Sequence, residues 1–94
     1  RTVVVKPYSD KSLAKGIIRR VFNETVDAGE LVWHQDHNAR KVTVVEGQGW
    51  QLQLDNDLPK SISEGDTFFI EAEQYHRIIK GNTNLVLDID ESNS

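Results

Sequence analysis

The feature of this sequence that most constrains its fold is a series of short apolar or alternating stretches, each ended by turn-forming residues. These stretches occupy residues 3–5, 16–22, 30–34, 41–46, 50–54, 67–70, 75–79 and 85–89. Side chains in a strand point alternately to opposite faces, so the pattern predicts strands with one buried and one exposed side. Short strands at this spacing predict an antiparallel sandwich or barrel.

Turn-forming residues separate the predicted strands, and glycine among them supplies the positive φ that tight turns need. The predicted turns lie at residues 27–29, 47–49, 55–57, 64–66 and 81–82. Helical signals are almost absent. Only residues 10–14 are predicted to form a single helical turn, with Ser9 or Asp10 as its cap.

Alternation also predicts which side chains face the core. Leu85, Leu87 and Ile89 are predicted to point inward from the last strand. In the stretch 41–46, the valines at 42 and 44 share a face with Arg40. One apolar and one polar face per strand predicts a single packed core.

The length of 94 residues predicts one domain over residues 1–94, with a barrel core at about 16–90 and a frayed tail at 91–94. A domain of this size buries a modest fraction of its surface and is marginally stable alone. Pairing of subunits would add buried surface, so we expect a homodimer.

Composition excludes several classes of protein. The chain has no cysteine, which rules out disulfides and thiolate metal sites and favours a reducing compartment. No apolar run approaches the ~18 residues of a membrane span. The net charge is −4, and Arg19-Arg20 is the only basic cluster, too small for nucleic-acid binding. We expect a soluble cytoplasmic protein that meets small molecules or other proteins, and neither membrane nor nucleic acid.

Two separate histidine segments carry the chemistry. His34 and Asp36 are two residues apart, so in a strand they project from one face, while His37 points away. With the distant His76 they can form a 2-His-1-carboxylate metal site. The same groups can also act without metal, as a carboxylate that orients an imidazole for proton transfer. A third interpretation makes these histidines ordinary polar residues at strand ends.

The first segment resembles motif one of the cupin superfamily, which has the form G-x5-H-x-H-x3–4-E-x6-G. Gly29 precedes His34 by one residue fewer than the motif requires. His34 and Asp36 fall on the two histidines, Arg40 falls on the glutamate, and Gly47 falls on the closing glycine.

The second segment resembles motif two of the same superfamily, G-x5-P-x-G-x2-H-x3-N. Gly65 falls on the first glycine and His76 on the histidine, with matching spacing. Glu71, Glu73 and Lys80 replace the proline, the second glycine and the asparagine. The two motifs cover about residues 29–80. The resemblance implies an all-β fold, a single antiparallel jelly-roll β-barrel of the cupin type.

The resemblance implies a cavity in which His34, Asp36 and His76 are the candidate catalytic groups and the candidate metal ligands. Arg40 departs from the pattern. A guanidinium stays protonated and has no lone pair for a metal, so it would repel a cation and attract Asp36. A metal-free cavity is therefore the first expectation, and a divalent metal (iron, manganese, nickel or zinc) is the alternative.

Three further residues are candidate substrate contacts. Arg40 suits an anionic ligand, since arginine binds carboxylates and phosphates in a bidentate way, although it can equally be a plain ion pair at the barrel mouth. Phe68 shares the parity of His76 and is expected to line the barrel. Trp50 is a candidate ligand contact against the alternative that it packs in the core or at an interface.

Cupins include enzymes of many kinds and proteins with no catalysis, so function must be argued from the site. Three hypotheses stay open. The first is an isomerase, epimerase or dehydratase acting on a sugar-like or anionic substrate. The second is a metal-dependent enzyme of the oxygenase type. The third is a non-catalytic binding or interaction module.

Overall fold

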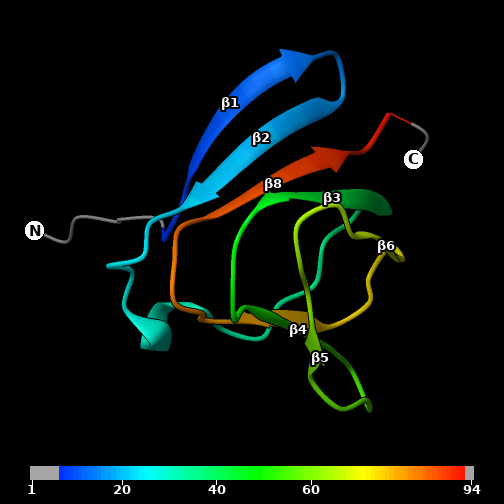
Figure 1. Cartoon of the computed structure of the whole chain (residues 1–94). Helices are drawn as coiled ribbons and strands as arrows, with labels where there is room; N and C mark the ends of the chain where they lie inside the picture. The colour runs from blue at the N-terminus through cyan, green and yellow to red at the C-terminus, as the bar shows by residue number, and fades with distance from the viewer. Residues whose placement is uncertain (1–6, 93–94) are drawn as a thin grey trace, which may run out of the picture.

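The computed structural model describes residues 7–92, which fold into two antiparallel sheets that lie one above the other (Figure 1). The larger sheet contains, in spatial order, β1 (Ser9–Ala14), β2 (Ile17–Phe22), β8 (Leu85–Asp90), β3 (Arg40–Glu46) and β6 (Thr67–Ile70). The smaller sheet contains β5 (Lys60–Ser61), β4 (Gln51–Leu54) and β7 (His76–Ile79). A single 3-10 turn, η1 (Ala28–Glu30), lies between β2 and β3 in the chain.

The predicted all-β, antiparallel jelly-roll architecture is confirmed, but the sheets do not close into a barrel. Within residues 7–92 no strand pairing joins the five-stranded sheet to the three-stranded one. The strands of the smaller sheet are only two to four residues long. Because the edge strands of the two sheets do not pair with each other over these residues, the fold is an open sandwich.

The core lies between the two sheets and follows the predicted alternation. Leu85, Leu87 and Ile89 of β8 are 0–4% exposed and face Val42 and Val44 of the neighbouring strand β3. The smaller sheet covers them with Leu52 and with the fully buried ring of Trp50. Each such side chain contributes roughly 1.5–3 kcal/mol by leaving water, which makes this layer the main source of stability.

Two local predictions were wrong. Residues 10–14 form the edge strand β1 and not a helical turn, because Asp10 and its neighbours pair with β2 and Asp10 accepts a bidentate hydrogen bond from Arg20. Residues 30–34 do not form a strand. The Asp27 side chain accepts from the Gly29 amide and starts η1, so the chain becomes extended only near His34.

The first two residues of the predicted frayed tail form hydrogen bonds in the structure. The Glu91 amide donates to the Gly16 carbonyl at 2.8 Å, and the Ser92 amide donates to the Asp90 carboxylate at 2.8 Å. These bonds hold residues 91 and 92 beside the β1–β2 turn. The predicted strand at 3–5 and the last two residues of the tail lie outside the described residues.

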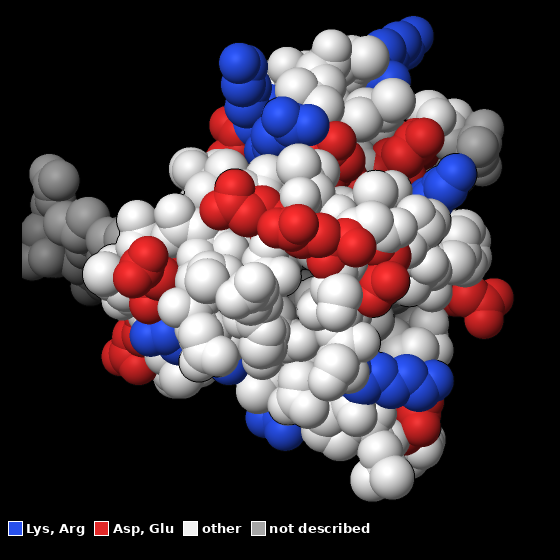
Figure 2. All heavy atoms as spheres, in the orientation of Figure 1, with Lys and Arg blue, Asp and Glu red and all other residues white. Residues whose placement is uncertain are grey.

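Charges on the surface are mixed in sign. Figure 2 shows a row of acidic side chains across the face in view, with lysines and arginines scattered above and below it. Over residues 7–92, no helix is long and apolar enough to cross a bilayer. The homodimer and the cytoplasmic location stay predictions.

The core layer gives a direct test of stability. Leu85→Ala is expected to lower the free energy of unfolding by ~2–5 kcal/mol, because Leu85 is fully buried and its removal leaves a cavity. Leu58→Ala is the matched control, since Leu58 is 78% exposed and its loss should cost less than about 0.5 kcal/mol. Urea denaturation of both variants measures the difference. Equal losses would contradict the placement of Leu85.

Candidate functional site

A pair of main-chain hydrogen bonds places the two distant histidines side by side. His34 and His76 form an isolated antiparallel bridge, in which the His34 amide donates to the His76 carbonyl at 3.0 Å and the reverse bond is 2.9 Å. Residues paired in this way point to the same face. Their rings consequently meet edge to face, with centroids 4.3 Å apart.

Asp36 joins the two histidines from the loop before β3. Its Oδ2 atom lies 3.3 Å from Nε2 of His76, and one ligand atom from each of His34, Asp36 and His76 falls within 4.8 Å of the others. The structure thus brings together the three residues predicted as the site. His37 points away, with its side chain 94% exposed beside Glu73.

Main-chain carbonyls fix the tautomer of both imidazoles. Nδ1 of His34 lies 2.9 Å from the Val32 carbonyl, and Nδ1 of His76 lies 2.8 Å from the Gln74 carbonyl. A carbonyl oxygen only accepts, so each Nδ1 donates its hydrogen and a neutral ring keeps a lone pair on Nε2. Histidines that bind metals are oriented in this way, with the second nitrogen donating to a carbonyl or carboxylate.

The environment of His76 favours its neutral form. Burial lowers the pKa of His76 below its ordinary value of 6.5, and the charges of His34 and Arg40 lower it further. The hydrogen bond to the Gln74 carbonyl and the charge of Asp36 act in the opposite direction without cancelling the shift. Near neutral pH the Nε2 lone pair of His76 therefore faces a carboxylate oxygen.

Oδ2 of Asp36 is a buried acceptor that receives no hydrogen bond within the described part of the chain. A buried polar atom without such a bond costs free energy, and two lone pairs opposed at 3.3 Å add repulsion. A cation between the two imidazoles and this oxygen removes both costs. Two imidazoles and one carboxylate are also a donor set that divalent iron, manganese, nickel and zinc accept. The residues present therefore fit a divalent metal.

Arg40 points into the site, as its expected attraction to Asp36 requires. Its Nη1 lies 3.5 Å from Oδ2 of Asp36, and its Nε donates to Oε2 of Glu91 at 2.7 Å. Two carboxylates around one guanidinium leave a single negative charge beside the histidines. This balance weakens the repulsion that Arg40 alone would exert on a metal.

The three residues open onto a cavity of about 280 Å³ between the sheets. Its volume is close to the lower end of small-molecule sites, which hold about 300–1,000 Å³. Apolar side chains form most of its wall, among them Val42, Phe68, Ile70, Ile78, Leu87 and Ile89. Phe68 lies in that wall, where its parity with His76 predicts it.

Trp50 does not contact this cavity. It is 0% exposed, and its indole Nε1 donates to the Thr83 carbonyl at 2.8 Å. Trp50 precedes β4, and the backbone of Gly81 packs directly against its ring. The core alternative for Trp50 is therefore the one that the structure supports, since a ring enclosed in this way has no face left for a ligand.

Arg20 is a cavity residue that the sequence reasoning missed. It lines the wall, makes a forked ion pair with Asp10 at 2.8 and 3.0 Å, and lies 3.7 Å over the ring of Tyr8. From the sequence alone, the pair Arg19-Arg20 was interpreted only as a small basic cluster. The missed signal is parity, because Arg20 shares its face of β2 with the inward Phe22.

Comparison with solved structures supports the fold. A cupin domain from Bordetella pertussis Tohama I has a TM-score of 0.65 at 12% identity, over 95% of this chain and 97% of that one. A Ralstonia eutropha JMP134 protein, provisionally assigned as a mannose-6-phosphate isomerase, has a TM-score of 0.65 at 23% identity, over 88% and 81%. The Fe(II) form of HppE with substrate has a TM-score of 0.63 at 16% identity, over 95% and 56%.

No family model and no curated protein matches the sequence. The likeness is one of structure, and identities this low establish the fold and no activity. The chain thus has a cupin fold, with a histidine–aspartate–histidine group that can hold a metal.

The lowered pKa of His76 predicts how stability depends on pH in chelator-treated protein. The folded state binds this proton less readily than the unfolded state. The stability that the neutral His76 contributes is therefore fully present above pH 6.5. It is lost as the pH falls toward the pKa of His76 in the folded state. Denaturant unfolding between about pH 8 and about pH 5 measures the slope.

His76→Gln should flatten that slope, because glutamine does not titrate. His37→Gln is the matched surface control and should keep the wild-type slope. A His76→Gln profile as steep as that of the wild type would contradict the assignment.

Proposed function

We propose that this protein binds a small polar or anionic molecule in the cavity between its sheets, beside a divalent metal held by His34, Asp36 and His76. One observation carries the proposal. The imidazoles of His34 and His76, each with Nδ1 bonded to a carbonyl, lie beside the carboxylate of Asp36, and one ligand atom of each residue falls within 4.8 Å of the others.

The three ligands leave room for a substrate. Two histidines and one carboxylate bind one side of a metal and leave its other positions open. Bound there, a divalent metal would supply a Lewis acid that polarises an oxygen of the substrate. His76, whose pKa lies below its ordinary value, needs no proton loss before binding at neutral pH, which favours uptake of a metal there.

The cavity wall indicates which molecules fit. Arg20 and Arg40 supply two guanidinium groups, each already facing a carboxylate, which favours a ligand that carries oxygens or a negative charge. Phe68 and Ile70 of β6, the strand paired with that of Arg40, line the same cavity and exclude water from the carbon side of the ligand. Such a division suits a compact, sugar-like or carboxylated molecule.

The structural neighbours agree with this range of chemistry. One neighbour is an iron(II) protein solved with its substrate, and another is provisionally assigned as a sugar-phosphate isomerase. For this chain we propose, by analogy, metal-assisted chemistry on a small oxygenated substrate.

The position of Arg40 supports a second candidate, a metal-free isomerase or epimerase. Nη1 of Arg40 lies 3.5 Å from the oxygen that would bind the metal and competes for it. In that case the Gln74 carbonyl orients His76 through Nδ1, the neutral imidazole acts as a general base through Nε2, and Asp36 stabilises the ring once it is protonated. A binding module with no chemistry is the third candidate.

Metal analysis separates these candidates. Protein purified without chelators is expected to hold close to one equivalent of iron, manganese, nickel or zinc. Asp36→Ala and His76→Ala should lose it, whereas His37→Ala, changed at an exposed side chain, should retain it. A metal at about 100 times its Kd should also raise the unfolding free energy by ~2.7 kcal/mol.

The outcome that contradicts the metal is equally definite. A content below about a tenth of an equivalent, with no uptake when each metal is titrated into folded protein, removes it and leaves the metal-free candidate. Circular dichroism of each variant shows whether the fold is retained, so lost metal is not confused with lost structure.

Arg40 should determine how strongly the cavity binds a metal relative to an anionic ligand. Arg40→Gln is expected to tighten metal binding by about tenfold, since it removes a positive charge beside Asp36, and a tenfold change corresponds to ~1.4 kcal/mol. The same change should weaken binding of an anionic ligand. Arg77→Gln, on the outer side of the smaller sheet, is the matched control, and isothermal titration calorimetry measures both affinities. Unchanged metal affinity in Arg40→Gln would show that Glu91 already neutralises Arg40.

A further inference from the structure

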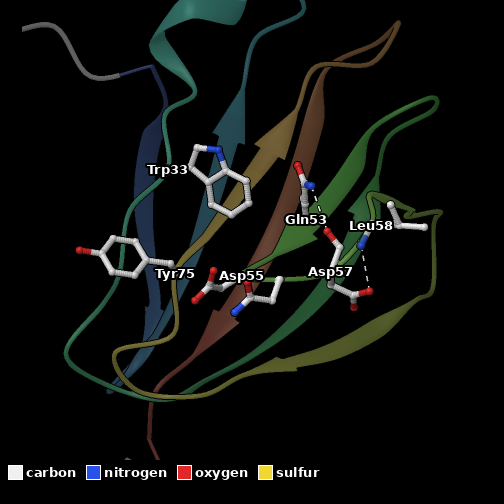
Figure 3. A pocket seen from close by; sticks show the side chains of 7 residues that line it. Trp33, Gln53, Asp55, Asp57, Leu58 and Tyr75 are labelled. Carbon is white, nitrogen blue, oxygen red and sulfur yellow. Dashed lines mark hydrogen bonds between the residues drawn. The ribbon is translucent and has the colours of Figure 1, made fainter.

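A second hollow lies on the outer side of the smaller sheet, on the face opposite the histidine cavity. It measures about 570 Å³ and is lined by Trp33, Gln53, residues 55–58 and Tyr75 (Figure 3). The volume is within the range of small-molecule sites, about 300–1,000 Å³. The hollow shares no lining residue with the inner cavity.

The bridge between the histidines creates both sites at once. Neighbours in an extended chain point to opposite faces, so Trp33 and Tyr75 turn outward where His34 and His76 turn inward. Trp33 is 42% exposed and Tyr75 is 48% exposed. Figure 3 shows the side chains of both residues among those that line the hollow, with Asp55 below them in this view. Both side chains therefore keep apolar surface exposed at the hollow, where a ligand can cover it.

The polar rim of the hollow combines fixed and available groups. Gln53 is fixed, because its amide donates to the Asp57 carbonyl at 3.0 Å and its oxygen accepts from Nε of Arg77 at 2.9 Å. Among the described residues, no hydrogen bond or ion pair engages the side chains of Asp55 and Asn56 or the hydroxyl of Tyr75. Acceptors and donors are therefore both available beside two aromatic rings.

These groups select the class of ligand. Aromatic faces carry partial negative charge and attract the polarised C–H groups of a sugar ring, while carboxylate, amide and phenol bond to its hydroxyls. A cation suits the hollow less well, because the Arg77 guanidinium already lies 5.0 Å over the Trp33 ring. Lys60 likewise pairs with Asp57 on the rim.

We infer that the outer hollow is a second binding site, specific for a neutral polyhydroxylated ligand of the carbohydrate class, with Trp33 and Tyr75 as its stacking surface. The site does not require the metal proposed for the inner cavity. Its Asp55 and Asn56 groups form hydrogen bonds to the ligand hydroxyls.

The two tryptophans provide a built-in comparison for the test. Maltose, cellobiose and N,N′-diacetylchitobiose are titrated separately into ¹⁵N-labelled protein, and the two indole N–H signals are followed by NMR. At least one disaccharide should shift the signal of the exposed Trp33 in a saturable way. The signal of Trp50, whose indole is bonded to the Thr83 carbonyl, should stay in place.

Variants assign the effect to the hollow. Tyr75→Ala should weaken the saturable binding by at least tenfold, and Trp33→Ala should abolish it when followed through the backbone amides of residues 55–58. Phe69→Ala is the matched control, because Phe69 is an exposed aromatic of β6, 59% exposed, that lies outside the hollow, and its loss should leave the affinity unchanged. Asp55→Asn should weaken binding less than tenfold, since the amide still bonds to a hydroxyl.

Three outcomes would overturn the inference. The first is no saturable shift with any of the three disaccharides. The second is saturation by choline with loss on Asp55→Asn, which would make the hollow a cation site. The third is a Trp33 shift that follows protein concentration alone, which would make it a contact between two copies of the chain. Retained dispersion in the NMR spectrum of each variant shows that the fold is intact.

Discussion

The arrangement of this protein depends on the two main-chain hydrogen bonds between His34 and His76. The two positions, 34 and 76, lie far apart in the chain. The bonds of 3.0 and 2.9 Å join them as neighbouring strand residues. Because the side-chain period of a strand is two, this single pairing turns both imidazoles inward. It turns Trp33 and Tyr75 outward at the same time. One register thus sets the composition of both hollows.

Electrostatic balance decides what the inner cavity can hold. Asp36 lies between the neutral His76 and the cationic Arg40, at 3.3 and 3.5 Å. Glu91 draws the guanidinium toward itself at 2.7 Å. The competition between a guanidinium and a metal for one carboxylate oxygen is the physical basis for both candidate functions. The surrounding apolar wall strengthens each of these interactions by keeping water out.

Strand positions were predictable where alternation was strong. The inward side chains of β8, and the shared face of Val42 and Val44 with Arg40, follow from period alone. The strand at Ser9–Ala14 was not predictable, because its residues adopt the strand conformation by pairing with β2 and bury little surface themselves. For Trp50 the sequence left ligand contact and core packing both open, and enclosure by the Gly81 backbone, which no sequence pattern shows, places it in the core.

The sequence by itself determined the all-β class, the parity that puts His34 and Asp36 on one face, and the absence of thiolate chemistry. These properties depend on residue type and on neighbours one or two positions away. Only the tertiary structure decided that the sheets stay open, that Arg40 lies between Asp36 and Glu91, and that Arg20 faces the cavity. Those outcomes depend on contacts between residues far apart in the chain, whose geometry is fixed only when the two sheets pack.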